Sequence, residues 1–218
     1  MKIIIDAMGG DFAPEAPVRG ALLAREKYGA DIILTGRTAD ILRELEKAGC
    51  KEVPQGIEIA NAEEVVEICD DPATAFKQKK DSSLTVGLNL LRDGQADGFI
   101  SAGSTGALHV GASLIVRTLK GVKRPALATM VPAKKQAYLL LDCGANVECR
   151  PEMLAAFAVM GSCYVNRVEG RTSPSVALAN TTEWVRAYSV SFIASPTLSS
   201  RASSLSVALS FLRQSDAA

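Results

Sequence analysis

Hydrophobic and polar positions follow a repeating block pattern through most of the chain. A β-branched run at residues 2–5, "KIII", ends at Asp6 before glycines and prolines, which is typical of a buried parallel strand. Amphipathic stretches predict helices at 15–28, 38–49, 82–92 and from Thr105, and strands are predicted at 31–36, 56–62 and 97–103. This alternation indicates βαβ units, so we expect a parallel sheet covered by helices on both faces.

The pattern changes after residue 125. Strands predicted at 126–132 and 137–144 are separated only by "AKKQ", so they either continue the parallel sheet or form a hairpin. A long apolar helix is predicted at 150–168. Residues 171–218 then hold 12 of the 18 serines, none of the 17 glycines and no lysine, which indicates a boundary. We interpret this segment as weakly structured.

Composition and charge narrow the function classes. With 24 basic and 24 acidic residues among 218, the net charge is zero, which gives no support to bulk nucleic-acid binding. The five cysteines are scattered and form no C-x-x-C pair, so neither a disulfide framework nor a zinc site is indicated. The apolar run near the N-terminus is too short for a signal peptide, and a cytoplasmic location is expected. No metal ion or cofactor is expected.

The stretch "SAGSTGAL" at 101–108 carries the first candidate site. It joins a strand end to a helix start, where free backbone N–H groups of the first helical turn attract anions. Gly103 and Gly106 allow close backbone approach to a phosphate, and Ser104 and Thr105 add hydroxyl groups. The spacing matches neither a dinucleotide nor a P-loop motif. The alternative interpretation is a tight turn with a Ser/Thr helix cap.

Two further strand ends repeat this chemistry. "IDAMGGD" brings Asp6, Gly9, Gly10 and Asp11 to the end of the first strand, and because ligands bind outside the carboxyl ends of parallel strands, both loops can face one crevice. "LLLDCGAN" places Asp142, Gly144 and Asn146 at a third strand end. For each aspartate taken singly, a helix cap or turn former is the favoured alternative.

Five motifs in order make one resemblance: "IDAMGGDFAP" at 5–14, "DPATAFKQKKDSSL" at 71–84, "SAGSTGAL", "GVKRPALATMVP" at 121–132 and "LDCGANVECRPEMLAAFAVMG" at 141–161. Together they resemble the bacterial acyl-acyl carrier protein:phosphate acyltransferases of phospholipid synthesis, from residue 1 to about 168. The resemblance implies an α/β fold, a three-layer α/β/α sandwich with a mostly parallel sheet, similar to phosphotransacetylase and the isocitrate dehydrogenases.

The resemblance also implies a reaction. Inorganic phosphate attacks the thioester of an acyl-acyl carrier protein, which gives an acyl phosphate for a downstream membrane acyl-phosphate:glycerol-3-phosphate acyltransferase. The family is usually a homodimer and can be membrane-peripheral. Phosphate is already a nucleophile, so the reaction needs positioning and oxyanion donors rather than a covalent enzyme group. The substrate-binding residues carried over are Asp6, Gly9, Gly10, Asp11, Lys80, Ser82, Ser101, Gly103, Ser104, Thr105, Gly106, Asp142, Gly144 and Asn146.

Several other residues have both a functional and a structural interpretation. Ser104 replaces the asparagine more usual in the family, which keeps a hydrogen-bond donor with shorter reach. Lys77, Lys79 and Lys80 either steer the acidic carrier protein or form a solvated helix face, and residues 120–124 carry the same two interpretations. His109, the only histidine, is interpreted as structural rather than as a general base.

The resemblance fails after Val168. We therefore predict an N-terminal part of the domain at 1–168, C-terminally incomplete, and an atypical tail at 169–218 that is weakly structured or translated out of frame. Such a chain is expected to fold in part, which puts its activity in doubt. The alternative functions are a phosphate acetyl- or butyryltransferase using coenzyme A and a non-catalytic module that binds phosphate or the carrier protein.

Overall fold

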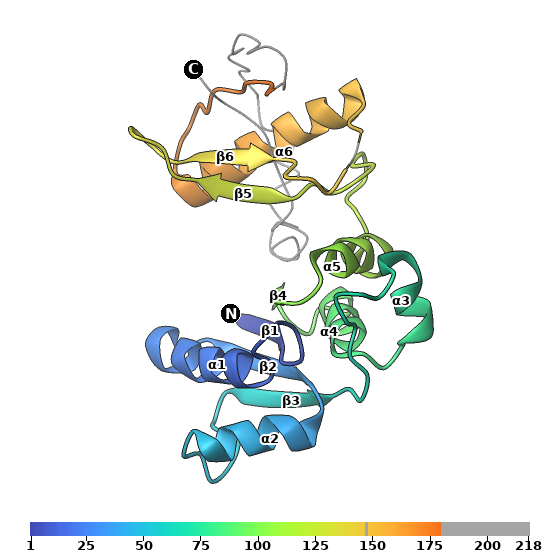
Figure 1. The fold of residues 1–218 in the computed structure, drawn as a ribbon. Helices are drawn as coiled ribbons and strands as arrows, with labels where there is room; N and C mark the ends of the chain where they lie inside the picture. Colours follow the sequence, from blue (N-terminus) through green and yellow to red (C-terminus); the bar gives the residue numbers. More distant parts are fainter. Residues whose placement is uncertain (147, 180–218) are drawn as a thin grey trace. The chain divides into compact units, whose positions relative to one another are not determined.

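A computed structural model describes residues 1–146 and 148–179 (Figure 1). The chain divides into two compact units, the first formed by Met1–Arg117 and the second beginning at Thr118. This division precedes the boundary predicted at residue 168, which stays a prediction. Most of the predicted tail, from residue 180 onward, lies outside the described residues.

The first unit contains a four-stranded sheet in the order β3-β2-β1-β4, and every neighbouring pair is parallel. This confirms the predicted α/β class with a mostly parallel sheet. The elements along the chain are β1 (Lys2–Asp6), α1 (Glu15–Tyr28), β2 (Asp31–Gly36), α2 (Thr38–Lys47), β3 (Ile57–Asn61), α3 (Pro72–Gln78), α4 (Ser83–Arg92), β4 (Gly98–Ile100), α5 (Thr105–Gly111) and the π-helical segment η1 (Ala112–Val116).

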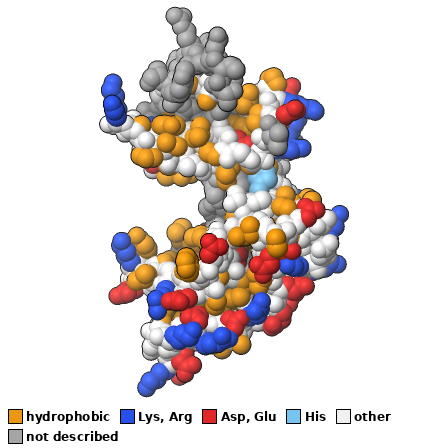
Figure 2. Space-filling model, viewed as in Figure 1, with side chains coloured by type: hydrophobic (Ala, Val, Ile, Leu, Met, Phe, Trp, Pro, Cys, Tyr) orange, Lys and Arg blue, Asp and Glu red, His pale blue; other side chains and the backbone are white. Residues whose placement is uncertain are grey.

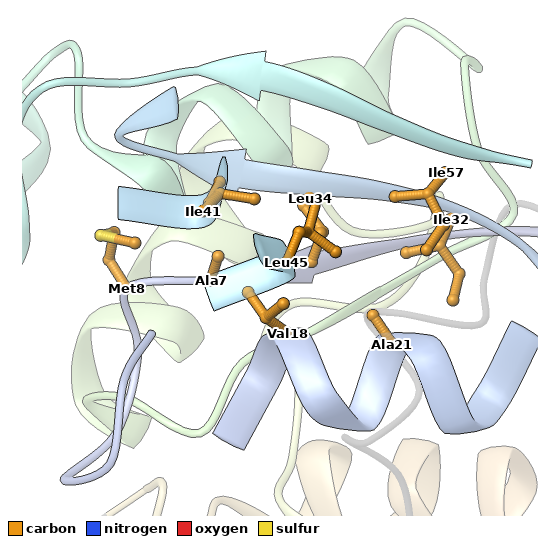
Figure 3. Close-up of a cluster of buried hydrophobic side chains, with 9 residues drawn as sticks. All are labelled: Ala7, Met8, Val18, Ala21, Ile32, Leu34, Ile41, Leu45 and Ile57. Atoms are coloured by element: carbon orange, nitrogen blue, oxygen red, sulfur yellow. The ribbon is translucent and has the colours of Figure 1, made fainter. Parts of the chain in front are cut away.

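The two faces of the sheet are covered by different helices. Successive strand residues point to opposite faces, so Ile32 and Leu34 of β2 pack with α1 and α2 (Figure 3). Ile33 points the other way and, with Ile4 of β1, packs against Leu84, Leu88 and Leu91 of α4. Each fully buried aliphatic side chain stabilises the fold by about 1.5–3 kcal/mol. The first unit is therefore a three-layer arrangement of helices, sheet and helices.

The cluster between α1, α2 and the sheet reaches the end of β1. Its members come from four elements and from the loop after β1 (Figure 3); they are Ala7, Met8, Val18, Ala21, Ile32, Leu34, Ile41, Leu45 and Ile57. Ala7 and Met8 belong to the loop after β1, so the start of the predicted first site loop is fixed by the core. This packing holds Asp6 at a defined position.

Helix α3 was not predicted from the sequence. It has seven residues and begins with Pro72 at its first position, and the side chain of Asp71 accepts a hydrogen bond from the Ala73 N–H as its N-cap. So short a segment shows too few turns for its periodicity to stand out. The other helices of this unit begin within one residue of their predicted starts.

The second unit contains a hairpin and one long helix. β5 (Ala128–Val131) and β6 (Tyr138–Leu141) pair antiparallel, so the hairpin alternative is confirmed for residues 126–144. α6 (Pro151–Glu169) packs on the hairpin through Met153, Phe157 and Val165. The helix ends at Gly170, which adopts a left-handed conformation with φ 70°.

Candidate functional site

The first two predicted loops meet at one place in the first unit. β1 and β4 are parallel neighbours, so the loops that follow them leave the same edge of the sheet. The chain runs from β1 to β2 and β3 on one side, then returns to β4 on the other side of β1. The β1/β4 boundary is therefore the point where strand order reverses, and open α/β sheets bind ligands outside such a point.

A buried carboxylate joins the two loops. Asp6 is 3% exposed, and its Oδ2 accepts a hydrogen bond from Ser101 Oγ at 2.7 Å. The Ser101 hydroxyl in turn accepts from the Gly103 N–H at 3.1 Å, and Asp6 Oδ1 accepts from the Met8 N–H at 3.1 Å. Hydrogen bonds to a charged acceptor are among the stronger ones in proteins. Asp6 therefore fixes both loops and is not directed at solvent.

The glycines of the two loops are needed for their close approach. A Cβ on Gly9 would lie 2.5 Å from Asp6 Oδ2 and 2.7 Å from Ser101 Oγ, and a Cβ on Gly103 would lie 3.3 Å from Gly9 Cα. Gly10 has φ 107°, a conformation that favours glycine. The two backbones thus pack directly on each other, and side chains other than hydrogen do not fit between them.

Some backbone N–H groups of the second loop are hydrogen-bonded within the fold, and others are free. Ser104 is the N-cap of α5, and its hydroxyl accepts from the Ala107 N–H at 3.3 Å, as in the alternative interpretation of a capped turn. Gly103 donates to Ser101. Thr105 and Gly106 are exposed, and their N–H groups have no acceptor among residues 1–146 and 148–179. The first turn of α5 therefore presents two amides for a ligand.

Helix α3 packs against the second glycine loop, a contact that the sequence did not indicate. A Cβ on Gly106 would lie 3.1 Å from Pro72 Cγ, so the first residue of α3 packs against the second glycine loop. The motif "DPATAF" contains Pro72, but its helical start became visible only in the structure. Its packing explains why the segment after Asp71 is folded beside the site.

The lysine-rich region is only partly free. Lys79 Nζ donates to the Val65 carbonyl at 2.8 Å and to Asp70 Oδ2 at 2.5 Å, and this hydrogen bond lowers the pKa of Asp70. Lys79 is therefore engaged within the fold, whereas Lys77 and Lys80 are exposed, and a steering role for these lysines stays a prediction.

Ser82, the other residue predicted from this region, is 0% exposed. Its hydroxyl caps α4 by accepting from the Thr85 N–H at 3.3 Å and lies 2.7 Å from Thr85 Oγ1. These contacts give Ser82 a structural role at the start of α4. Asp11, at the other end of the first loop, is exposed. A contact of either residue with substrate stays a prediction.

The third predicted loop lies in the second unit. Asp142 accepts from the N–H groups of Leu127, Ala145 and Asn146, at 2.7–3.1 Å, and from Asn146 Nδ2 at 2.8 Å. Asn146 Nδ2 also donates to the Pro125 carbonyl at 3.0 Å. Gly144 is exposed with φ 101°. These contacts connect the loop to the segment before β5.

Cys149 lies near the same carboxylate. Burial, with a smaller contribution from the negative charge of Asp142, raises the pKa of the Cys149 thiol. A raised pKa keeps a thiol protonated and poorly nucleophilic. The Cys149 thiol is therefore expected to react more slowly than an exposed one.

The comparison with protein families assigns the chain to a family. The family model described as "Fatty acid synthesis protein" matches residues 1–189. The chain belongs to this family. The match includes all five sequence motifs and continues past residue 168, where the resemblance was expected to end.

Curated relatives agree with this assignment. A phosphate acyltransferase of Clostridium botulinum (strain Loch Maree / Type A3) is 45% identical over 181 residues, which cover 83% of this chain and 53% of the relative. One of Myxococcus xanthus (strain DK1622) is 45% identical over 186 residues, which cover 84% of this chain and 52% of the relative. The resemblance to phosphate acyltransferases is confirmed, and the chain spans about half the length of these relatives.

Solved structures support the fold. EutD phosphotransacetylase from Staphylococcus aureus superposes with a TM-score of 0.56 at 19% identity, over 76% of this chain and 52% of that one. A phosphotransacetylase from Streptococcus pyogenes gives a TM-score of 0.58 at 20% identity, over 84% and 60%. At these identities the similarity shows the fold alone, and it confirms the predicted likeness to phosphotransacetylase.

The described residues contain neither a candidate membrane span nor a candidate metal cluster. None of the helices in 1–146 and 148–179 combines the length and apolar character needed to cross a bilayer. Within the same ranges, no three His, Cys, Asp or Glu side chains are grouped so that they could hold a metal ion.

Proposed function

We propose that this chain carries the phosphate site of a phosphate acyltransferase that uses acyl-acyl carrier protein. A phosphate oxygen attacks the thioester carbonyl, the C–O bond forms, the C–S bond breaks, and the carrier leaves as a thiolate that takes up a proton. The products are an acyl phosphate and free carrier protein. The observation that supports this most is the junction of the two glycine loops at the strand-order reversal beside β1.

The described residues suit a reaction that depends on positioning. The N–H groups of Thr105 and Gly106 offer donors to phosphate oxygens, and the backbone at Gly9 and Gly10 packs against the loop that precedes them. Asp6 holds the two glycine loops together by accepting the hydrogen bond from Ser101. Such preorganised donors lower the cost of placing the nucleophile and of stabilising developing charge.

Substitutions at Thr105 test the amide contribution. Thr105 is the first helical residue after Ser104, a position where proline fits, and Ser104 already has the extended backbone that a following proline requires. Thr105→Pro therefore removes one free N–H while keeping the helix. Thr105→Ala is the matched control because it removes the hydroxyl and keeps the amide.

The assay is phosphate-dependent release of thiol from acyl-acyl carrier protein, with phosphate binding measured separately. We expect Thr105→Pro to weaken phosphate binding by about tenfold, the usual scale for one hydrogen bond to a charged group, and Thr105→Ala to change it little. Equal phosphate affinity in all three proteins would contradict the assignment of the amides.

The donor is tested in the same assay. Release from acyl-acyl carrier protein but not from acetyl- or butyryl-coenzyme A supports the proposed substrate, and the reverse supports the coenzyme A alternative. Binding of phosphate without any thiol release would favour the non-catalytic module. A cytoplasmic location, a homodimer and delivery of acyl phosphate to a membrane glycerol-3-phosphate acyltransferase belong to this proposal.

A further inference from the structure

Charge is distributed unevenly between the two units although the chain is neutral. Residues 1–117 contain 13 basic and 18 acidic side chains, whereas residues 118–179 contain 8 basic and only 4 acidic ones. The described part of the second unit therefore carries a net positive charge, whereas the first unit carries a net negative charge. Zero total charge hides this difference, and a field of one sign over a small unit attracts partners of the opposite sign.

Ion pairing accentuates the difference. Within the first unit, eight of the basic side chains form ion pairs, and in Figure 2 acidic and basic side chains intermingle over this part of the surface. In the second unit only Arg171 is paired, with Glu169, as far as residues 118–146 and 148–179 show. Lys120, Lys123 and Arg124 are exposed and have no ion-pair partner in those ranges.

A small apolar notch lies beside two of these cations. It has a volume of about 50 Å³ and is lined by Gly121, Lys123 and Arg124, together with Glu152, Met153, Ala156 and Phe157 of α6. Pockets that enclose small-molecule ligands begin at roughly 300 Å³, so this notch is too small for one. It is large enough to take the end of one apolar side chain.

The segment that carries the cations is held in place. Pro125 and Leu127, directly after Arg124, are tied to Asn146 and Asp142 through the Pro125 carbonyl and the Leu127 N–H at 3.0 and 2.9 Å. The Asp142 motif therefore fixes the chain that displays Lys123 and Arg124. A rigid display lowers the entropy lost when a partner binds.

We propose that Lys120, Lys123, Arg124 and the adjacent notch form a docking surface for an acidic protein. Its carboxylates would lie over the three cations, and one of its apolar side chains would enter the notch. This inference rests on the proposed function, which supplies the partner: the acyl carrier protein. An anionic membrane would satisfy the cations but has no use for a notch of single-side-chain size, so the protein partner is favoured.

The test is the association of purified acyl-acyl carrier protein with the whole chain, measured at low and at physiological salt. The variant is Lys123→Glu with Arg124→Glu. Its matched control is Lys134→Glu with Lys135→Glu, because these lysines are also exposed in the second unit and the charge change is identical. We expect the first variant to associate about tenfold more slowly at low salt and the control to change much less.

A second variant separates the notch from the charge and guards against misfolding of the first. Ala156→Leu fills the notch without changing charge and is expected to weaken binding severalfold, mainly through faster dissociation. Equal losses in both charge variants, an unchanged affinity in the Lys123/Arg124 variant, or no carrier binding at all would overturn the inference. So would binding to vesicles of anionic phospholipid that needs Lys123 and Arg124 when the carrier protein does not bind.

The outcomes also distinguish this inference from the proposed function. If the carrier protein binds through Lys123 and Arg124 but no thiol is released, the docking surface stands and the proposed reaction fails. If phosphate-dependent release proceeds and charge reversal leaves its KM for acyl-acyl carrier protein unchanged, the reaction stands and the docking surface fails.

Discussion

The close contact between the two glycine loops predicts that Gly9→Ala destabilises the first unit. The new Cβ would lie 2.5 Å from Asp6 Oδ2, 2.7 Å from Ser101 Oγ and 3.0 Å from the Gly103 nitrogen. Real Cβ atoms do not approach so closely, so the loops must separate and the Ser101–Asp6 hydrogen bond must lengthen. The backbone of Gly9 is not in the left-handed region, so the cost comes from space alone.

Overpacking of this kind costs about 1–3 kcal/mol. Gly20→Ala is the matched control, because Gly20 lies within α1 and nothing stands within 4 Å of its added Cβ. Alanine is the better helix former by about 0.5–1 kcal/mol, so this control should stabilise the chain. The same substitution at two glycines is thus expected to act with opposite signs.

Urea unfolding measures both effects. With unchanged slopes, the midpoint should move down for Gly9→Ala and up for Gly20→Ala relative to the parent chain. In thermal melts, each kcal/mol corresponds to about 2–4 °C for a chain of this size. A Gly9→Ala protein as stable as the parent, or shifts of equal sign in both variants, would refute the contact between the loops.

Three further predictions follow from single contacts. Ser104→Ala removes the cap of α5 and should lower stability by about 1 kcal/mol in urea unfolding. Cys149, whose thiol pKa is raised by burial, should react with iodoacetamide more slowly than exposed Cys69 near pH 8, as peptide mass spectrometry would show. Lys79 holds the pKa of Asp70 below its usual 3.8. The pair therefore stabilises the chain above that pH, and this stabilisation is lost as the pH falls through the lowered pKa. Asp70→Asn should make the free energy of unfolding depend less on pH in the acid range.

Much of the first unit could be predicted because its signals are periodic. Alternation of short β-branched runs with amphipathic stretches identified the parallel sheet, and the strand-end glycines identified two loops that the structure brings together at β1 and β4. The spatial order of the strands, which makes this junction the point of reversal, is not encoded in any local pattern. It depends on long-range packing of the helices on the two faces.

Side-chain roles were harder to predict than positions. Lys79 and Lys80 are adjacent and of one type, yet only Lys79 folds inward onto Asp70, because Val65 and Asp70 lie within its reach. Ser82 is predicted to bind substrate from the family resemblance, and the sequence did not indicate that its hydroxyl is buried and caps α4. Such roles are fixed by neighbours distant in sequence, which residue type and spacing do not reveal.

The central claim is that the free amides at the start of α5, beside the first glycine loop, hold inorganic phosphate. Backbone ¹H–¹⁵N spectra of the chain during titration with phosphate test it most directly. We predict saturable shifts at Thr105 and Gly106, accompanied by Gly9 and Gly10. Saturable binding with shifts confined to exposed lysines such as Lys80, or no shift at these four amides, would contradict the account.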